Sequence, residues 1–217
     1  MKPTQRAHEE ILKVRDEFLN KGEQVFNSLD LTAGNGHDTL FLATTVSNSS
    51  SFFPSVIAFD IQRDAILATE ERLLNNGFNS ENSYWKEITY IVVGENKPCC
   101  CVYLINDSHK NVRKPTTVKI TPKTFHFAMF NLGYLPNADK TVITQPKTTI
   151  KALRGVLKLL VSGGIVTMVL YSGHEGGDTE REAVIKYLNK LNKKKFKVTQ
   201  FKEEIERNSE LWTIIKI

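Results

Sequence analysis

The stretch "LDLTAGNGHDTLFLA" at residues 29–43 decides the fold, because an apolar run leads into a glycine turn and then into an amphipathic segment. Gly34 and Gly36 allow positive φ angles and let the backbone approach a ligand closely. The next segment opens with Asp38, and the unpaired amide groups of its first turn face the same place. A strand, a glycine turn and a helix in this order are typical of the ligand-binding turn of a doubly wound α/β sheet.

The charges around this turn favour one kind of ligand. A dinucleotide-binding turn would read G-x-G-x-x-G, but Thr39 replaces the last glycine. Asp30 and Asp38 flank the turn, where carboxylates would repel a pyrophosphate and attract an amine or a sulfonium. Asp60 ends the next predicted strand, 24 residues after Gly36, and can accept both hydroxyls of a ribose. We therefore predict S-adenosylmethionine as the cofactor; the alternative is a structural glycine turn followed by an ordinary aspartate.

The rest of the chain alternates apolar runs with amphipathic segments, as expected for a parallel sheet with helices on both faces. Residues 78–98 are interpreted as an insertion with strand content in "EITYIVV". The predicted α/β fold is the Rossmann-like, doubly wound, seven-stranded sheet of class I methyltransferases, mostly parallel with an antiparallel last strand. Its helices are expected at 6–20, 38–44, 63–77, 147–161 and 178–192, and its strands at 24–31, 55–61, 99–107, 125–132, 164–171, 195–201 and 210–217. Gly77 is the predicted stop signal of the third helix, and a turn is expected at "SGG", residues 162–164.

Composition bounds the class of protein. A chain of 217 residues with 41% hydrophobic residues predicts one domain over 1–217, with an insertion near 76–101. No apolar run approaches the roughly 20 residues that span a bilayer, and the polar beginning lacks the core of a secretory signal, so we expect a cytoplasmic protein and no membrane partner. The consecutive Cys99, Cys100 and Cys101 lack zinc-site spacing and indicate a buried strand; no metal is expected. The net charge of +5 allows RNA as a partner.

A second motif, "FNLGYLP" at 130–136, leaves an apolar strand through a polar turn. In a methyl-transferring fold, Asn131 and the neighbouring carbonyls could hold a substrate amine by its hydrogens, with Tyr134 closing over it. Because a lysine-like amine has a pKa of about 10.4, selecting its neutral form costs on the order of 4 kcal/mol. Asp139, His109 and His174 are candidates for accepting that proton, and the sequence does not rank them. The alternative role of Asn131 is to cap the turn.

Several motifs together resemble a known family. "DLTAGNGHDTLFLA", "AFDIQRDAI", "DSHKNV", "FNLGYLPNADKTVITQPKTTIKAL" and "GGIVTMVLYSGHEGG" are similar, in order and position, to those of the small rRNA methylase-like enzymes. This family includes the tRNA (5-aminomethyl-2-thiouridine) methyltransferases, which methylate the aminomethyl group of a wobble uridine. The resemblance covers about residues 6–75 and 102–195. It implies an N-methyltransferase that uses S-adenosylmethionine on tRNA, and related small enzymes suggest a homodimer.

The resemblance also assigns roles to individual residues. Around the methionine part of the cofactor it places Asp30, Gly34, Asn35, Gly36, Asp38 and Thr39, with Asp60 and Gln62 on the ribose side and Ser108 and His109 on the adenine side. It makes Asn131, Leu132, Gly133 and Tyr134 the catalytic group, and it forms the substrate site from Lys140, Thr148, Thr149, Tyr171 and His174.

Other functions stay open at this point. The acceptor could be rRNA or a small amine, or the chain could be an RNA-binding module with a vestigial cofactor pocket. A nicotinamide dehydrogenase is disfavoured by the missing third glycine. Among the remaining polar residues, His126 on an apolar strand is expected in the core, and His8 on the surface of the first helix, with contact to RNA as the alternative. The run "NKKKFK" at 192–197 predicts a solvated helix end, with phosphate binding as the alternative.

Overall fold

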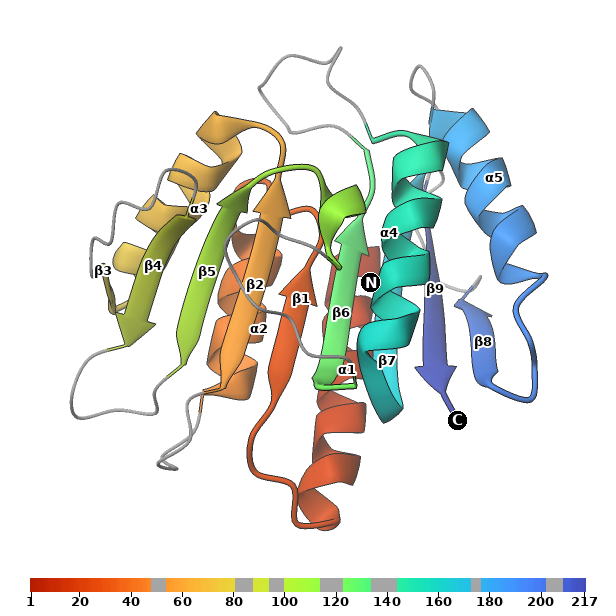
Figure 1. The fold of residues 1–217 in the computed structure, drawn as a ribbon, viewed down its shortest axis with the longest axis horizontal. Helices are drawn as coiled ribbons and strands as arrows, with labels where there is room; N and C mark the ends of the chain where they lie inside the picture. Colours follow the sequence, from red (N-terminus) through yellow and green to blue (C-terminus); the bar gives the residue numbers. More distant parts are fainter. Residues whose placement is uncertain are drawn as a thin grey trace.

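The computed structural model describes residues 1–47, 54–80, 88–93, 100–113, 123–133, 144–172, 177–201 and 209–217. Helices and strands alternate along much of this part of the chain (Figure 1). In chain order they are α1 (Pro3–Asn20), β1 (Asn27–Asp30), α2 (His37–Val46), β2 (Ser55–Asp60), α3 (Arg63–Leu74), β3 (Phe78–Ser80), β4 (Ile88–Val93), β5 (Cys101–Asn106), the 3-10 helix η1 (His109–Asn111), β6 (Phe125–Asn131), α4 (Pro146–Leu159), β7 (Leu160–Tyr171), α5 (Gly177–Leu188), β8 (Phe196–Phe201) and β9 (Ser209–Lys216). The alternation is broken where β3, β4 and β5 follow one another directly, as do β8 and β9.

The strands form one mixed sheet in the order β3-β4-β5-β2-β1-β6-β7-β9-β8. From β5 to β7 neighbouring strands run parallel, whereas β9 runs antiparallel to both β7 and β8. Seven of these strands, β5-β2-β1-β6-β7-β9-β8, are the predicted ones. The predicted doubly wound sheet with an antiparallel last strand is therefore confirmed. The order reverses beside β1, so the ends of β1, β2 and β6 border the crevice where such sheets bind ligands.

The insertion extends the sheet beyond the seven predicted strands. The strands β3 and β4 pair antiparallel with each other, and β4 pairs antiparallel with β5. The strand content expected within 78–98 is thus present, although 81–87 and 94–99 lie outside the described residues. Cys100 and Cys101 are buried at the start of β5, as predicted, while Cys99 is outside the description.

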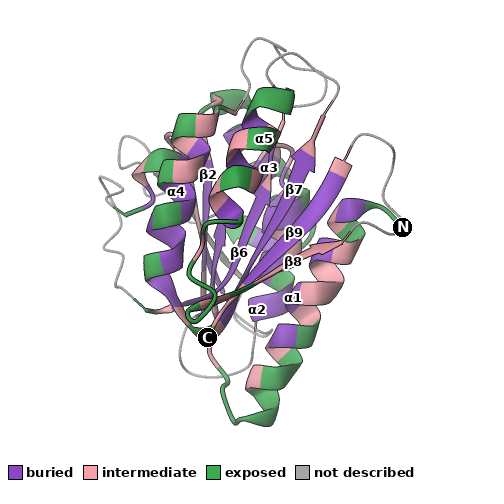
Figure 2. Cartoon of the chain, turned by 90° about the vertical axis from the view of Figure 1, so that its right-hand side faces the viewer, coloured by how far each residue is buried: buried purple, intermediate pink, exposed green. Residues whose placement is uncertain are grey.

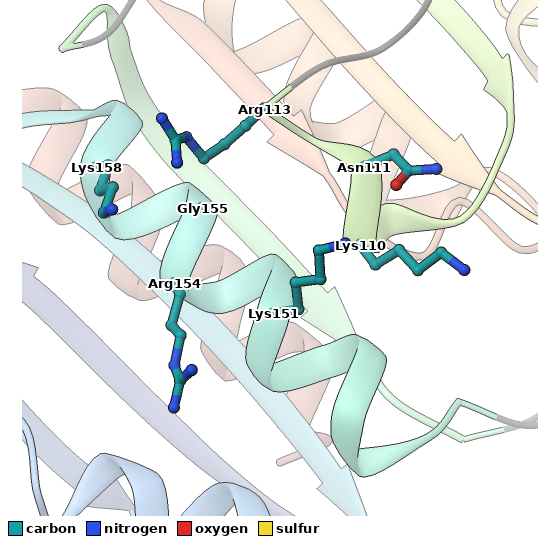
Figure 3. Close-up of a pocket in the computed structure, with 7 residues that line it drawn as sticks. All are labelled: Lys110, Asn111, Arg113, Lys151, Arg154, Gly155 and Lys158. Carbon is teal, nitrogen blue, oxygen red and sulfur yellow. The ribbon is translucent and has the colours of Figure 1, made fainter.

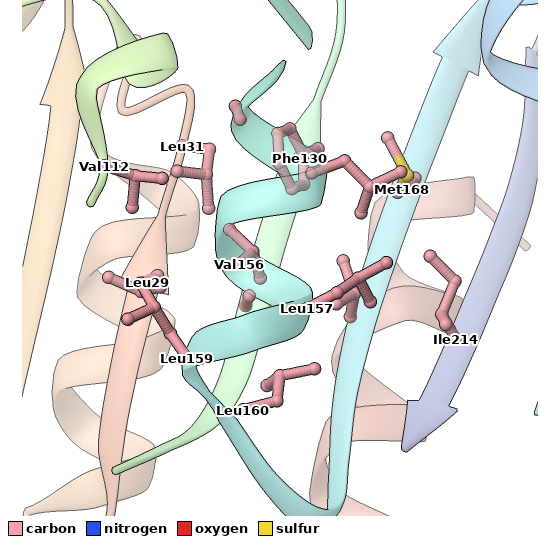
Figure 4. Close-up of a cluster of buried hydrophobic side chains, with 14 of the residues drawn as sticks. Leu29, Leu31, Val112, Phe130, Val156, Leu157, Leu159, Leu160, Met168 and Ile214 are labelled. Carbon is pink, nitrogen blue, oxygen red and sulfur yellow. The ribbon is translucent and has the colours of Figure 1, made fainter. Parts of the chain in front are cut away.

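Two hydrophobic layers cover the two faces of the sheet. On β2, Val56 and Ala58 belong to the layer under α1, α2 and α3, whereas Ile57 and Phe59 belong to the layer under α4 and α5. This alternation follows from the two-residue period of a strand. Figures 1 and 2 show the buried strands between the two sets of helices, and Figure 4 shows the second layer. Burying one such large side chain contributes about 1.5–3 kcal/mol.

Two local features refine the predicted elements. The expected turn at 162–164 is instead a bulge inside β7, because Leu160 pairs with Phe125 and Ile165 with Phe127, which leaves the intervening residues out of register. His126 lies in the core, as predicted: it is 6% exposed and the rings of Phe18 and Phe26 meet it edge-on. Burial lowers the pKa of His126 to about 4.

Within the described part of the chain, none of the helices is long and apolar enough to cross a membrane.

Candidate active site

The turn after β1 is built around a buried carboxylate. Asp30 is fully buried and accepts hydrogen bonds from the backbone N–H of Thr32 at 3.0 Å and from the hydroxyl of Thr39 at 2.6 Å. Burial, reinforced by the negative charge of Asp38, raises the pKa of Asp30 to about 7. A cation placed here would favour the ionised form of Asp30 and so be attracted to the turn.

Gly36 lies in close contact with α3, which leaves no room for a side chain at this position. Gly36 has a φ of 78°, and a Cβ at this position would lie 2.8 Å from the Cα of Thr69. The Thr69 hydroxyl donates to the carbonyl of Gly34 at 3.1 Å, and Nε of Arg72 donates to the carbonyl of Asn35 at 2.5 Å. The turn is therefore held against α3 by backbone geometry that a side chain would disrupt.

Asp60 closes the other side of the turn. Its carboxylate accepts one hydrogen bond from the backbone N–H of Gly34 and one from that of Gln62, each at 2.9 Å. Burial raises the pKa of Asp60, and the two backbone hydrogen bonds oppose that rise. A carboxylate has about four acceptor positions, so acceptor capacity remains for the two hydroxyls of a ribose. The role of Asp60 and Gln62 on the ribose side stays a prediction.

The residues predicted for the adenine side, Ser108 and His109, lie at the start of η1. The backbone N–H of Ser108 donates to the Asp107 carboxylate at 2.6 Å, and His109 follows at the start of η1 with 9% of its surface exposed. Among the described residues, Nε2 of His109 has no hydrogen-bond partner. Burial lowers the pKa of His109 to about 4, so the ring is neutral at pH 7 and this nitrogen is suited to a neutral heterocycle. The same pKa makes His109 a weak acceptor for the proton of an amine.

Asn131, at the end of β6, faces the acidic start of α2. Its side-chain Nδ2 lies 3.4 Å from Oδ2 of Asp38, and its backbone N–H donates to the hydroxyl of Thr32 at 2.7 Å. The other oxygen of Asp38 lies 2.7 Å from Nε2 of His8, whose ring stacks on Phe41 at 3.7 Å. Asp38 therefore joins the N-terminal helix to the predicted catalytic group.

Gly133, just after β6, and Thr144, just before α4, are tied to a buried glutamate on α5. Gly133 donates its N–H to the hydroxyl of Thr144 at 3.1 Å, and Thr144 returns its own N–H to the carbonyl of Gly133 at 3.3 Å. The hydroxyls of Thr144 and Thr149 both donate to Glu180, which is 3% exposed. Thr149 is fully buried, so its described contact supports this arrangement rather than an open surface.

The remaining predicted site residues divide into two groups. Leu132 is buried, Thr148 is half-buried with its hydroxyl on the carbonyl of Gln145 at 2.9 Å, and Tyr171 is half-buried at the end of β7. Others lie outside the described residues: Tyr134, Asp139, Lys140 and His174.

Sequence reasoning missed three contributors to the site: His8, Thr32 and Glu180. His8 had been expected on the surface, but it contacts Asp38 across 30 residues of sequence. Thr32 sits inside the quoted turn, where a hydroxyl two residues after Asp30 was a usable signal. Glu180 carries no such signal, because only the packing of α5 against α4 brings it to Thr149.

The arrangement fits an adenosyl cofactor with a cationic side chain. Three carboxylates, those of Asp30, Asp38 and Asp60, gather at the adjacent ends of β1, α2 and β2. They suit an amine, a sulfonium and a ribose, while the free nitrogen of buried His109 suits the base. Among the described residues, no group of three or more His, Cys, Asp or Glu side chains is arranged to hold a metal ion.

Two solved structures resemble this chain over its whole length. A protein of Clostridium thermocellum described as a "putative rRNA-methylase" is 32% identical, with a TM-score of 0.74 over 100% of this chain and 98% of that one. A protein of Streptococcus mutans described as "a putative methyltransferase", solved in complex with SAH, is 29% identical, with a TM-score of 0.73 over 100% and 99% of the two chains. Fold and site thus define a class I methyltransferase that depends on S-adenosylmethionine, as predicted.

The family follows from the sequence match. The model of the family described as "Putative rRNA methylase" matches residues 56–216, and the chain belongs to this family. A relative from Arabidopsis thaliana, named "tRNA (mnm(5)s(2)U34)-methyltransferase, chloroplastic", is 36% identical over 186 residues. That match covers 84% of this chain and 57% of the relative, so the chain spans little more than half of the relative's length.

Proposed function

We propose that this chain transfers a methyl group from S-adenosylmethionine to the aminomethyl nitrogen of a modified uridine at the wobble position of tRNA. The observation that carries the proposal is the position of Asn131 against Asp38. The name of the Arabidopsis relative, which specifies a modified tRNA uridine, supports the same acceptor. The basic composition of the chain, with a net charge of +5, is compatible with an RNA substrate.

Asp38 orients the side chain of Asn131. An ionised carboxylate only accepts hydrogen bonds, so the Asn131 atom facing Asp38 at 3.4 Å is the amide nitrogen. The amide oxygen is then left to accept an N–H of the substrate amine. Because the backbone N–H of Asn131 is also held by Thr32, the side chain starts from a fixed position. Positioning of this kind supplies much of the acceleration of a displacement reaction.

The bound cofactor supplies a methyl group on a positively charged sulfur. What the chain must add is a place for the amine proton, since an alkyl amine with a pKa of about 10.4 is mostly protonated at neutral pH. His109, with its pKa near 4, is poorly suited to this task. The proposal assigns the proton to the pair formed by His8 and Asp38, whose atoms are 2.7 Å apart beside Asn131.

The test uses purified full chain and cofactor labelled in its methyl group. Label should enter tRNA that carries 5-aminomethyl-2-thiouridine and should not enter the same tRNA without the aminomethyl group. Transfer to rRNA or to a small amine alone would refute the proposed acceptor and leave the methyltransferase class intact. No transfer to any of these acceptors at saturating cofactor would favour the non-catalytic RNA-binding module instead.

A further inference from the structure

One groove on the surface of the molecule is lined mainly by basic side chains. This groove lies between η1 and α4 and has a volume of about 360 Å³. Five of its seven lining residues are Lys or Arg and none is acidic; the lining consists of Lys110, Asn111, Arg113, Lys151, Arg154, Gly155 and Lys158 (Figure 3). We call this the α4 groove. None of its five cations forms an ion pair with another residue that the structure describes.

The charge pattern of α4 differs from that of an ordinary surface helix. Its exposed positions are Lys147, Lys151, Arg154 and Lys158, whose spacing of four, three and four places them on one face. Like charges four residues apart destabilise a helix by about 0.2–0.5 kcal/mol a pair, and α4 contains no acidic residue to offset them. The helix therefore carries an electrostatic cost that an anionic partner would remove.

Helix α1 shows the usual arrangement in the same molecule. There, Arg6 pairs with Glu9 at 3.2 Å and with Glu10 at 3.0 Å, and Lys13 pairs with Glu10 at 2.7 Å. Cations on that helix are thus neutralised along its own surface. The contrast indicates that the unmixed positive face of α4 is a property of that surface rather than of the whole chain.

A glycine lets the two sides of the α4 groove come together. A Cβ at Gly155 would lie 2.8 Å from Cγ1 of Val112 and 3.1 Å from Cγ of Arg113, so only glycine fits without displacing the segment after η1. Glycine inside a helix costs about 1 kcal/mol relative to alanine. In return, Arg113 lies across α4 beside Gly155, as Figure 3 shows. The guanidinium of Arg154 is directed away from Arg113 and lies 5.2 Å from the ring centroid of Tyr187 on α5.

The carboxylate of Asp107, two residues before η1, is hydrogen-bonded to its own neighbours in the chain. Both carboxylate oxygens of Asp107 accept from Nδ2 of Asn111, at 3.1 and 2.9 Å, and one also accepts from the N–H of Ser108 at 2.6 Å. Asp107 is therefore occupied by neutral donors and is not among the residues lining the α4 groove. The positive charge of the groove is left for a ligand.

From these observations we propose that the α4 groove binds the phosphodiester backbone of the RNA substrate, an inference that rests on the proposed function. Lys151 and Lys158 are seven residues apart, which corresponds to about 10 Å of helix and to about three phosphates of one strand. A lipid surface would require apolar side chains beside the cations. The exposed large hydrophobic residues of the described chain lie outside α4 and η1: Met1, Leu19, Ile61, Leu67, Leu74 and Ile217.

The groove also connects with the proposed active site through both of its walls. His109 opens η1, and Thr149 on α4 shares Glu180 with Thr144, which is hydrogen-bonded to Gly133. A backbone held along α4 would thus be anchored to the same elements that border the reacting group. Because phosphate contacts do not read sequence, the groove should hold tRNA with or without the aminomethyl group equally well.

The test compares tRNA binding by three full-length proteins: wild type, the groove variant K110E/K151E/K158E, and the control variant K193E/K194E/K195E. The control makes the same change of charge at three exposed lysines beyond α5. Fluorescence anisotropy at several salt concentrations gives the Kd for tRNA and its salt dependence. Calorimetry with S-adenosylhomocysteine checks that each variant keeps its fold and cofactor site. A neutral variant, K110Q/K151Q/K158Q, replaces the groove variant if charge reversal prevents folding.

We expect the groove variant to bind tRNA at least 10-fold more weakly, and its slope of log Kd against log salt to fall by about 2, the value for three lost contacts to a single strand. The control should stay close to wild type. Equal losses in both variants, or an unchanged Kd and slope in the groove variant, would overturn the proposal. The binding assay does not depend on methyl transfer. If the α4 groove binds tRNA but the protein transfers no methyl group, the proposed function is refuted and the proposed groove is not.

Discussion

The raised pKa of Asp30 makes cofactor binding depend on pH. With a pKa of about 7, Asp30 is mostly protonated at pH 6 and mostly ionised at pH 8 in the free protein. A cationic ligand beside Asp30 favours the ionised form, so below pH 7 binding must first release a proton. The cofactor affinity should therefore rise with pH across this range.

The size of the effect follows from the pKa. If only the ionised form binds well, the apparent Kd is multiplied by one plus the ratio of protonated to ionised Asp30, which is about 11 at pH 6 and about 1.1 at pH 8. We thus expect the Kd for S-adenosylmethionine to fall about 10-fold between pH 6 and pH 8. This corresponds to about 1.4 kcal/mol of binding free energy.

Isothermal calorimetry at both pH values, in two buffers of different ionisation enthalpy, measures the affinity and the released proton together. Asp30→Asn mimics the protonated carboxyl, because its uncharged amide offers an NH2 donor group and a C=O acceptor in place of the O–H and C=O. That variant should bind with a weak, pH-independent Kd and release no proton. Asp64→Asn, an exposed change at the start of α3, should keep the wild-type behaviour. An affinity that is flat in the wild type, or equally pH-dependent in Asp30→Asn, would refute the reasoning.

Three further changes test separate parts of the structure. Folding raises the pKa of Asp30 from 3.8 to about 7, so the folded protein favours the protonated carboxyl. Ionised Asp30 therefore lowers the free energy of unfolding, increasingly from pH 4 to pH 7, by at most about 4 kcal/mol. Urea unfolding of the free protein should show stability falling over this pH range, and falling less in Asp30→Asn. Gly36→Ala should lower the free energy of unfolding by about 3 kcal/mol, because of its φ of 78° and its contact with α3. Gly22→Ala, with a φ of 85° and open space around it, should lower it by about 1 kcal/mol in the same assay. Equal losses in the two variants would exclude the packing contribution. Asn131→Ala should lower kcat about 100-fold with the cofactor Kd unchanged, and a loss of cofactor affinity instead would place Asn131 in the cofactor site.

Much of the fold was predictable because local signals agreed with the overall pattern. The glycine turn after Asp30 and the stop at Gly77 separate apolar runs of strand length from amphipathic runs of helix length. The strands β3 and β4 at one end of the sheet were less clear, since a short strand is defined by its partner: β3 pairs with β4, and β4 pairs with β5. The bulge in β7 was read as a turn because "SGG" gives the same local signal for both.

Candidate site residues can be recognised in the sequence where they end a predicted strand. Asp30 and Asp60 are recognisable because each ends a strand of a parallel sheet. The contact of His8 with Asp38 has no such signal, because it depends on how α1 packs beside α2. Likewise, the basic residues of α4 can be read from the sequence, but only the structure brings Arg113 alongside them.

The charges at the turn between Asp30 and Asp60 should select S-adenosylmethionine over a dinucleotide. Crystals of the protein soaked with S-adenosylhomocysteine or with NAD⁺ test this directly. We predict ordered adenosyl density with the ribose hydroxyls on Asp60 and the amine facing Asp30 and Asp38, and no dinucleotide in the parallel soak. A dinucleotide bound with its pyrophosphate at the start of α2, together with an empty site in the S-adenosylhomocysteine soak, would contradict the account.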